Sequence, residues 1–371
     1  MVEPNRTVQE QDSVAGTKRQ DERTLRLPFE CLRSVAGGLN EVRLWWDPNL
    51  ECRRIGKRID LSNLDDVLPE AATLQMIDHR NVVPVLAAAS VDGYPQPMNV
   101  IEIVTPYYPR GSVTDALLAR ESIVPTDAVR IVQAALRGLG CVHEVHGIAH
   151  RDIKSGNILL ADDGSIAKLA DLGLAGVFDT NGTVPALDNP TLYTPPELVA
   201  TGILTRASDL FSMGLVLLEL LRGPFEYESY STAFVVERLM SRRSPLSAAD
   251  RKYPLWVSRS MIRLLNKALN TRPSQRFQTA SDMDHQLSRV RVIDWAKVEE
   301  LRWEAPFRHH PERRIRVEAT ALRKGGLRLS TRMNRGNGWR RYGFRDLDVE
   351  VLDSTPVRRL FDQATDTAIV R

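Results

Sequence analysis

The sequence predicts an α+β fold with room for two lobes and an appendage, and three observations support this. Its 371 residues can bury a sizeable core, and 43% of them are hydrophobic while 26% are charged, as in an ordinary globular protein. Residues 99–107 and 166–170 are apolar-rich runs typical of buried strands. Residues 126–146 repeat apolar side chains at helical spacing, which predicts one long helix.

One short run carries the chemistry. The eight residues from His150 to Asn157 (HRDIKSGN) contain a carboxylate, an amide and cations, and Asp171-Leu172-Gly173 follows the second strand-like run. Phosphoryl transfer requires a carboxylate that orients and deprotonates a hydroxyl, and oxygen ligands for Mg²⁺ across a triphosphate. Asp152 is the candidate for the first role, and Asn157 and Asp171 are the candidate metal ligands.

These residues resemble the H-R-D-L-x-x-x-N and D-F-G motifs of the eukaryotic-type protein kinases, with Ile153 in place of Leu and Leu172 in place of Phe. The resemblance covers about residues 25–290. It implies a bilobal kinase fold with ATP and Mg²⁺ as cofactors, in which a small β-rich N-lobe (25–105) precedes a larger helical C-lobe (110–290). Residues 1–24 are polar with few large apolar side chains, so we expect a disordered leader there.

A Gly-rich loop is expected near the start of the N-lobe. The family pattern is G-x-G-x-x-G-x-V, whose glycines let backbone amides close over phosphates. Gly37 and Val42 fit it, whereas Val35 and Asn40 replace the first and third glycines. Taken alone, the glycine pair that begins at Gly37 fits a hairpin turn better than a phosphate-binding loop. With its position in the chain, it predicts ATP contacts at Val35, Gly37 and Val42.

Lys57 stands where the family keeps the lysine of V-A-I-K, which neutralises the α and β phosphates and pairs with a helix glutamate. Glu70 shares one helical face with Leu74 and Ile77, so the resemblance predicts that it points inward toward Lys57. The alternative is that a lysine among arginines is solvated surface. Ile55 departs from the usual small residue, which predicts a narrower adenine pocket.

Other roles follow from the resemblance. Residues 105–109 are the expected hinge, with Thr105 and Tyr107 as adenine contacts. Lys154 would stabilise charge on the transferred phosphoryl group, and its presence resembles the serine/threonine class. Arg151 would grip a phosphate on the activation loop, for which the candidate acceptors are Thr180, Thr183 and Thr191.

The end of the activation loop resembles the A-P-E motif and supplies Glu197. Arg276, in an R-P-x-x-R element, would form a buried ion pair with Glu197. Asp209 would accept hydrogen bonds from the backbone of the catalytic loop, or would otherwise be a helix N-cap. Pro190 replaces a threonine that often contacts the catalytic residues, and the neighbouring Thr191 would substitute for it if the loop shifts.

Beyond the kinase-like region, residues 291–371 form a basic C-terminal extension that we expect to be partly ordered or disordered. Residues 302–345 carry a net charge of +10, although the whole chain carries only +3. Five aromatic residues interleave with the arginines: Trp303, Phe307, Trp339, Tyr342 and Phe344. This composition suits an acidic or phosphorylated partner, while the absence of a nucleic-acid-binding motif argues against nucleic acid. The alternative, which we favour, packs the aromatics onto the kinase lobe and leaves the arginines solvated.

Cysteine content and the N-terminus predict the cellular setting. Cys31, Cys52 and Cys141 have no metal or redox spacing, so we expect reduced, mostly buried thiols. Residues 1–20 lack the apolar core of a signal peptide, and no apolar run is long enough to span a membrane. The sequence therefore predicts a cytoplasmic protein, without separating cytoplasm from nucleus.

Three functions compete. The first is a serine/threonine protein kinase acting on a protein substrate. The second is a pseudokinase that serves as a protein-interaction scaffold, favoured by the missing glycines, Ile55 and Pro190. Against it, every residue expected to touch metal, proton or phosphoryl charge is present. The third is a small-molecule kinase of related fold, against which the peptide-platform elements around Glu197 and Arg276 argue.

Overall fold

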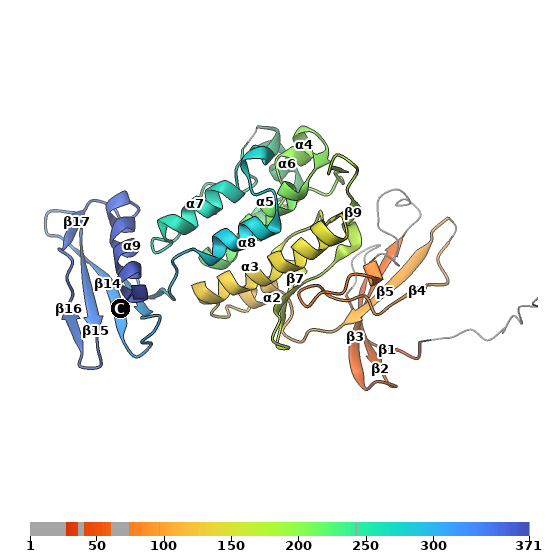
Figure 1. The fold of residues 1–371 in the computed structure, drawn as a ribbon, viewed down its shortest axis with the longest axis horizontal. Helices are drawn as coiled ribbons and strands as arrows, with labels where there is room; N and C mark the ends of the chain where they lie inside the picture. Colours follow the sequence, from red (N-terminus) through yellow and green to blue (C-terminus); the bar gives the residue numbers. More distant parts are fainter. Residues whose placement is uncertain (1–26, 36–40, 61–73, 96, 242, 371) are drawn as a thin grey trace, which may run out of the picture.

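The structure, a computed structural model, describes residues 27–35, 41–60, 74–95, 97–241 and 243–370. The leader expected at the N-terminus lies outside these ranges. Figure 1 shows three parts arranged along the long axis: a β-sheet lobe, a helical lobe, and a second sheet with one helix. The predicted α+β class and the order of its lobes match this arrangement.

The first lobe is a five-stranded antiparallel sheet in the order β1-β2-β3-β5-β4. Its strands are β1 (Glu30–Val35), β2 (Val42–Asp47), β3 (Cys52–Asp60), β4 (Ala87–Ser90) and β5 (Val100–Pro106). The register pairs Ile55 with Thr105 and Lys57 with Ile103. Because side chains alternate between the two faces of a strand, these four residues share one face of the sheet.

The second lobe is helical around one buried helix. Its helices are α2 (Val113–Leu118), α3 (Pro125–Gly140), α4 (Glu197–Ala200), α5 (Arg206–Arg222), α6 (Thr232–Met240), α7 (Arg259–Ala268) and α8 (Ala280–Ser288). Every residue from Ala207 to Leu221 is buried, so α5 is the centre of this lobe. The long helix predicted at 126–146 is α3 together with a π-helical turn, η1 (Cys141–Val145).

Short strands hold the loops between these helices. They form three two-stranded pairs: β6 (Ile148–Ala149) with β9 (Gly176–Val177), β7 (Ile158–Ala161) with β8 (Ile166–Leu169), and β10 (Val184–Pro185) with β11 (Ile203–Leu204). Single 3₁₀ turns also occur: η2 (Ser155–Asn157), η3 (Leu172–Leu174), η4 (Tyr227–Ser229) and η5 (Pro273–Gln275). The loop from His150 to Asn157 therefore starts at β6 and ends at β7, anchored at both ends by strand pairing.

The C-terminal extension is an ordered sheet covered by a helix. Its elements are β12 (Ala296–Glu299), β13 (Arg302–Pro306), β14 (Arg314–Ala321), β15 (Leu327–Asn334), β16 (Trp339–Arg341), β17 (Leu347–Val349) and α9 (Thr355–Val370). Gly325 and Gly326 turn the chain between β14 and β15 with positive φ angles, a conformation that favours glycine. We call residues 293–370 the C-terminal unit.

The C-terminal unit has its own hydrophobic core, which corrects the expected packing of its aromatics onto the helical lobe. The Trp303 and Phe361 rings meet edge to face at 5.6 Å, and the Trp295 and Phe361 rings do so at 5.1 Å. Phe307 is 2% exposed and belongs to the same cluster. These aromatics form a core between α9 and the inner face of the sheet, and alternation along β13 turns Trp303 to that side.

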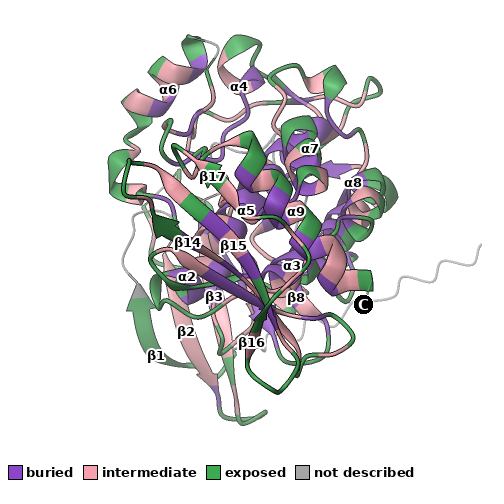
Figure 2. Cartoon of the chain, turned by 90° about the vertical axis from the view of Figure 1, so that its left-hand side faces the viewer, coloured by how far each residue is buried: buried purple, intermediate pink, exposed green. Residues whose placement is uncertain are grey.

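The outer face of this sheet corrects the expectation of solvated arginines. Arg316 lies 2.6 Å from Glu304, and Arg332 lies 2.5 Å from Glu318, across neighbouring strands. The guanidinium of Arg316 also lies 3.8 Å from the centre of the Trp339 ring. Figure 2 looks onto the C-terminal sheet and shows intermediate and exposed residues alternating with buried ones. The expectation is thus wrong for these arginines, whereas Arg323, Arg340 and Arg345 are exposed and form no ion pair with a described residue.

Polar contacts join the C-terminal unit to the helical lobe. The main-chain amide and hydroxyl of Thr126 donate to Asp294 at 2.9 and 2.7 Å. Arg358 of α9 donates to the carbonyl oxygens of Tyr253 and Pro254. As in Figure 1, α9 lies on the side of the sheet that faces the helical lobe.

The cysteines and helices bear on two further expectations. Cys31 is exposed, while Cys52 and Cys141 are partly buried, so the prediction of mostly buried thiols is wrong. All three are free. Within the described residues, no helix combines the length and apolar character needed to cross a membrane.

Candidate active site

The loop between β6 and β7 concentrates polar side chains around Asp152. Lys154 Nζ donates to Asp152 Oδ2 at 2.7 Å, and Asn157 Nδ2 donates to the same oxygen at 2.9 Å. Asn157 Nδ2 also donates to the main-chain oxygen of Asp152 at 2.8 Å. Asp152 is 9% exposed, and no described residue donates to its other oxygen, Oδ1. One carboxylate oxygen is thus fixed by two donors while the other is available as an acceptor.

Asp209 of α5 fixes the start of this loop. Its Oδ1 accepts the main-chain amide of Arg151 at 2.9 Å, and its Oδ2 accepts that of His150 at 2.8 Å. His143 Nε2 lies 2.7 Å from the same Oδ2. Burial alone would raise the pKa of Asp209, but the hydrogen bond and charge of His143, with smaller contributions from His150, lower it overall. The predicted backbone contact is present, and the N-cap alternative is wrong because Thr205 caps α5.

A cavity of about 870 Å³ lies between the first sheet and the helical lobe. Its lining is mostly aliphatic and comes from β2, β3, β5, η2, β7, β8, the residues before β4 and the segment after β8: Val42, Ile55, Lys57, Ile59, Leu74, Val83, Val85, Ile103, Thr105, Pro106, Gly156, Asn157, Leu159, Leu169, Ala170, Asp171, Leu172 and Gly173. Val42 and Thr105 lie at the cavity as expected, and Ile55 adds bulk to its wall. Tyr107 is not among the described lining residues; its ring lies 5.8 Å from the guanidinium of Arg53.

Lys57 reaches across this cavity to Asp171. Its Nζ lies 2.5 Å from Asp171 Oδ1, an oxygen that also accepts the main-chain amide of Gly173 at 3.3 Å. Burial alone would raise the pKa of Asp171, but the charge and hydrogen bond of Lys57 lower it overall. The expected partner Glu70 lies outside the described residues.

The Gly-rich loop is described only at its two ends. Gly37 lies outside the described residues, and Val35 is described only through its backbone, which pairs with Val42 at the end of β1. The predicted contacts of Gly37 and Val35 with ATP therefore stay predictions.

The two candidate metal ligands face the same cavity. Asn157 commits its Nδ2 to Asp152, which leaves its Oδ1 as an acceptor, and Asp171 has Oδ2 available beside the Lys57 contact. Among the described residues, no group of three or more His, Cys, Asp or Glu side chains is arranged to hold a metal ion. Mg²⁺ takes oxygen ligands and usually shares them between one or two protein side chains and phosphates. These two oxygens fit that pattern.

Arg151 contacts the predicted activation loop, residues 171–197, through main-chain oxygens; we call this stretch the activation segment. Its guanidinium donates to the carbonyls of Leu174 and Ala175 at 2.6 Å and to that of Pro185 at 3.0 Å. Burial lowers the pKa of Arg151 to about 10. These contacts join the catalytic loop to both ends of the β9–β10 stretch, in the place where the sequence predicted contact with a phosphate.

The candidate phosphate acceptors differ in exposure. Thr180 is exposed, whereas the Thr183 hydroxyl donates to Asp179 at 2.9 Å. Thr191 is partly buried, and its hydroxyl accepts the main-chain amide of Tyr193 at 3.2 Å. Within the described part of the chain, no hydrogen bond joins Thr191 to Asp152 or Lys154. The proposed substitution of Thr191 for the missing threonine is therefore not seen.

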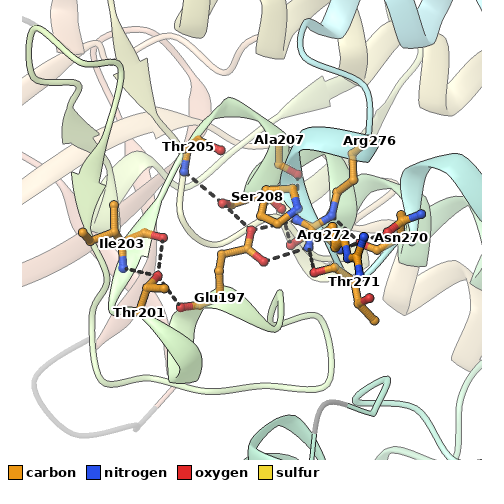
Figure 3. Close-up of polar contacts among 12 residues, drawn as sticks. Glu197, Thr201, Ile203, Thr205, Ala207, Ser208, Asn270, Thr271, Arg272 and Arg276 are labelled. Atoms are coloured by element: carbon orange, nitrogen blue, oxygen red, sulfur yellow. Dashed lines mark hydrogen bonds and ion pairs between the residues drawn. The ribbon is translucent and has the colours of Figure 1, made fainter.

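The structure contains the buried ion pair that the sequence predicted between Glu197 and Arg276. Arg276 Nη1 and Nη2 each donate to one oxygen of Glu197, both at 2.7 Å (Figure 3). Ser208 donates a further hydrogen bond to Glu197 at 2.7 Å. Arg276 also donates to the carbonyl oxygens of Asn270, Ala207 and Thr271, so its guanidinium is fully engaged. The pair ties the end of the activation segment to the segment before α8.

A second buried network supports the catalytic loop, and sequence reasoning missed it. Glu219, in the last turn of α5, is 0% exposed and accepts hydrogen bonds from Tyr193, at 2.6 Å, and from Tyr227. Tyr193 OH lies 2.7 Å from Ser155 Oγ, which lies 2.6 Å from Thr114 Oγ1. Burial raises the pKa of Glu219 despite these donors. A single glutamate in the apolar-rich run of residues 210–221 was the available signal.

Comparison with known proteins decides the family. A family model described as the protein kinase domain matches residues 52–288, more than half of the chain. The chain belongs to the eukaryotic-type protein kinase family. The first lobe is thus the N-lobe of a kinase domain and the helical lobe its C-lobe.

Individual relatives are distant. The chain is 26% identical over 258 residues to serine/threonine-protein kinase 12 of Arabidopsis thaliana, covering 67% of this chain and 54% of that protein. It is 28% identical over 267 residues to serine/threonine-protein kinase PrkC of Bacillus subtilis, covering 69% and 39%. It is 34% identical over 186 residues to EPD1-interacting receptor-like cytoplasmic serine/threonine-protein kinase 5A of Gossypium barbadense, covering 47% and 39%. The chain therefore spans about half, or less, of the length of these relatives.

Proposed function

We propose that this kinase domain transfers the γ-phosphoryl group of ATP to a serine or threonine hydroxyl of a protein. The observation that carries the proposal is that Lys154 and Asn157 both donate to the carboxylate of Asp152. This group lies beside the cavity that Lys57 and Asp171 line. The names of the relatives support the serine/threonine class. Lys154 supports it too, because tyrosine kinases usually place a different sequence beside the catalytic aspartate.

The catalytic carboxylate acts on the substrate hydroxyl. Asp152 Oδ1 accepts a hydrogen bond from the hydroxyl and takes its proton as the oxygen attacks the γ-phosphorus. The bond from the γ-phosphorus to the bridging oxygen of ADP breaks, and a new phosphorus–oxygen bond to the substrate forms. Lys154 places its charge beside Asp152, where it stabilises the phosphoryl group in transit. Asp209 holds the loop that carries both residues.

The aliphatic walls of the cavity accept adenine, and the backbone near Thr105 supplies the hinge hydrogen bonds. Lys57 leaves Asp171 and contacts the α and β phosphates, pairing with Glu70 as the family does. Asn157 and Asp171 would hold Mg²⁺ through the oxygens that remain available. When bound, Mg²⁺ neutralises charge on the phosphates of the nucleotide. Arg151 would bind a phosphate on the activation segment if that segment is phosphorylated.

A phosphate-transfer assay tests the proposal. The purified chain would receive γ-labelled ATP, Mg²⁺ and casein, and phosphoamino-acid analysis would separate serine and threonine from tyrosine. Asp152→Asn should reduce transfer by roughly 10²–10⁴-fold while leaving ATP binding intact, since the carboxylate acts on the proton and not on the nucleotide. Labelling of tyrosine alone would overturn the class assignment, and full activity of Asp152→Asn would overturn its role.

The alternative is a pseudokinase that acts as a protein-interaction scaffold. The substitutions Val35 and Asn40 in the Gly-rich loop, and Ile55 in the wall of the cavity, favour it. A folded wild-type chain that binds no ATP and labels no protein would establish this alternative.

The partners and the setting remain proposals. The substrate is a protein, and the basic 302–345 segment would contact an acidic or phosphorylated partner through arginines that its own glutamates leave unpaired. The cytoplasm is the proposed location, supported by cysteines whose spacing fits neither disulfides nor a metal site.

A further inference from the structure

An open groove lined by arginines lies at the junction of the C-lobe and the C-terminal unit. Its volume is about 890 Å³. Four arginines line it: Arg259 and Arg263 from α7, Arg289 from the end of α8, and Arg291 just beyond. Two aspartates of α9, Asp362 and Asp366, line it from the other side, and hydroxyl side chains complete it. Figure 1 shows α7, α8 and α9 meeting in this part of the molecule.

Only two of the four arginines form ion pairs with described residues. Arg259 Nε lies 2.5 Å from Asp362, and Arg291 lies 2.6 Å from Asp366, so these two pairs tie α9 to the C-lobe. Arg263 and Arg289 are exposed, and neither side chain makes a hydrogen bond or ion pair with any described residue. The groove therefore has a net charge of +2, and two guanidinium groups with five N–H donors each supply it.

We propose that this groove binds the phosphate of a phosphorylated serine or threonine in a protein partner. A guanidinium group donates two parallel hydrogen bonds to a phosphate, and a phosphate dianion matches the charge that Asp362 and Asp366 leave uncompensated. The inference goes beyond the proposed function and does not rest on it. No residue that lines the groove also lines the nucleotide cavity.

The lining favours a phosphorylated polypeptide over other carriers of phosphate. All described lining residues are arginine, aspartate, serine or threonine. No aromatic ring is present on which a base would stack, and the two aspartates oppose a strand that carries a phosphate at every nucleotide. No apolar side chain lines the groove that would enter a bilayer beside a lipid headgroup. Arg263 and Arg289 line the same open groove, so the phosphate would enter it while the polypeptide stays on its open side.

Binding of phosphopeptides to the full chain tests the proposal. The probe is a fluorescent peptide mixture with random flanking residues and one central phosphoserine or phosphothreonine, compared with the same mixture without phosphate by fluorescence polarisation. We expect the phosphorylated mixture to bind about tenfold tighter or more, because hydrogen bonds to a charged phosphate are stronger than those to a neutral hydroxyl. The Arg263→Ala/Arg289→Ala double variant should lose this preference. Arg263→Lys/Arg289→Lys should lose most of it, since lysine keeps the charge but not the fork.

The matched control is Arg243→Ala, which removes an exposed arginine of the C-lobe outside the groove. It should bind like the wild type, and circular dichroism should show the same helix content for all variants. Equal binding of both peptide mixtures, or an equal loss in Arg243→Ala, would overturn the proposal. So would a double variant that keeps its phosphopeptide preference but no longer binds a single-stranded oligonucleotide or phosphatidylserine vesicles.

Discussion

Removing the guanidinium of Arg276 is the sharpest test of how this kinase domain holds its activation segment. The side chain of Arg276 is 0% exposed and that of Glu197 is 7% exposed, so water cannot replace the lost partner. In Arg276→Met the flexible thioether fills much of the volume, but the Glu197 carboxylate keeps only Ser208 as a side-chain donor. Three carbonyl oxygens, of Asn270, Ala207 and Thr271, lose their donor as well.

The expected cost follows from the burial of the pair. Breaking a buried ion pair on one side leaves an uncompensated charge and costs about 3–5 kcal/mol. For a domain of this size that corresponds to a fall in Tm of roughly 6–20 °C. The second variant, Glu197→Gln/Arg276→Met, removes the stranded charge. It should therefore be less destabilised than the sum of its two single variants by about 1–3 kcal/mol.

Urea unfolding followed by far-UV circular dichroism is the suitable assay, because most helices of the chain belong to the C-lobe. Tryptophan fluorescence would report elsewhere, since the six tryptophans lie in the N-lobe, near the C-terminal unit or within it. Arg272→Met is the control: its exposed side chain lies four residues away, and its loss should stay within about 0.5 kcal/mol. A loss below about 1 kcal/mol in Arg276→Met, or strict additivity in the double variant, would refute the reasoning.

Four further outcomes are expected. Lys57→Met should lower phosphate transfer by at least about 100-fold in steady-state assays, because the cation that contacts the phosphates is lost. Gly56→Ala should lower the free energy of unfolding by about 1–3 kcal/mol in urea, since the added Cβ overlaps the carboxylate of Glu102. The stability lost in Asp209→Asn should shrink as the pH falls below about 4. Folding lowers the pKa of Asp209, so its charged carboxylate stabilises the fold at pH values above the pKa of the unfolded chain. This stabilisation is lost as the pH falls through the pKa of the folded state. Deleting residues 302–371 should leave transfer measurable while Tm falls, because the C-lobe has a separate core.

Each of these four predictions has a control variant or an outcome that would contradict it. Arg33→Met, which removes an exposed cation of β1, should keep full activity; an equally active Lys57→Met would show that another lysine meets the nucleotide. Gly140→Ala, whose added Cβ has its nearest neighbour at 3.7 Å, should not destabilise the chain. A pH-independent loss in Asp209→Asn would remove the charge argument. An unfolded truncation product would make the C-terminal unit part of the C-lobe core.

Sequence reasoning grouped the candidate active-site residues best where they are close in the chain. Lys154 and Asn157 are two and five residues from Asp152, so the loop itself brings their donors to its carboxylate. The Glu197–Arg276 pair spans 79 residues, and only the family resemblance pointed to it. The residue that Lys57 contacts was harder to predict from the sequence. Asp171 and Glu70 both offer a carboxylate, and spacing alone does not decide which one a lysine 114 residues from Asp171 contacts.

Buried polar networks were not predictable in the same way. The hydrogen bonds that Glu219 accepts from Tyr193 and Tyr227 depend on the packing of three separate elements around α5. In the sequence, such a glutamate is visible only as one charged residue within an apolar run. Its cost of burial implies that partners exist, because an unpaired buried carboxylate would be strongly unfavourable, but it does not name them.

The C-terminal unit shows why net charge is a weak guide to ligand sites. Its period of two was visible in the sequence: Ile315, Val317 and Ala319 alternate with charged residues along β14, and the structure turns the two sets to opposite faces. That alternation places arginines opposite glutamates on neighbouring strands, so Arg316 and Arg332 are paired within the sheet although residues 302–345 keep a net charge of +10. The unpaired arginines that line a groove are Arg263 in α7 and Arg289 after α8, outside the basic 302–345 segment. A ligand responds to charge that the fold leaves uncompensated, and that quantity depends on strand register and helix contacts, which composition does not contain.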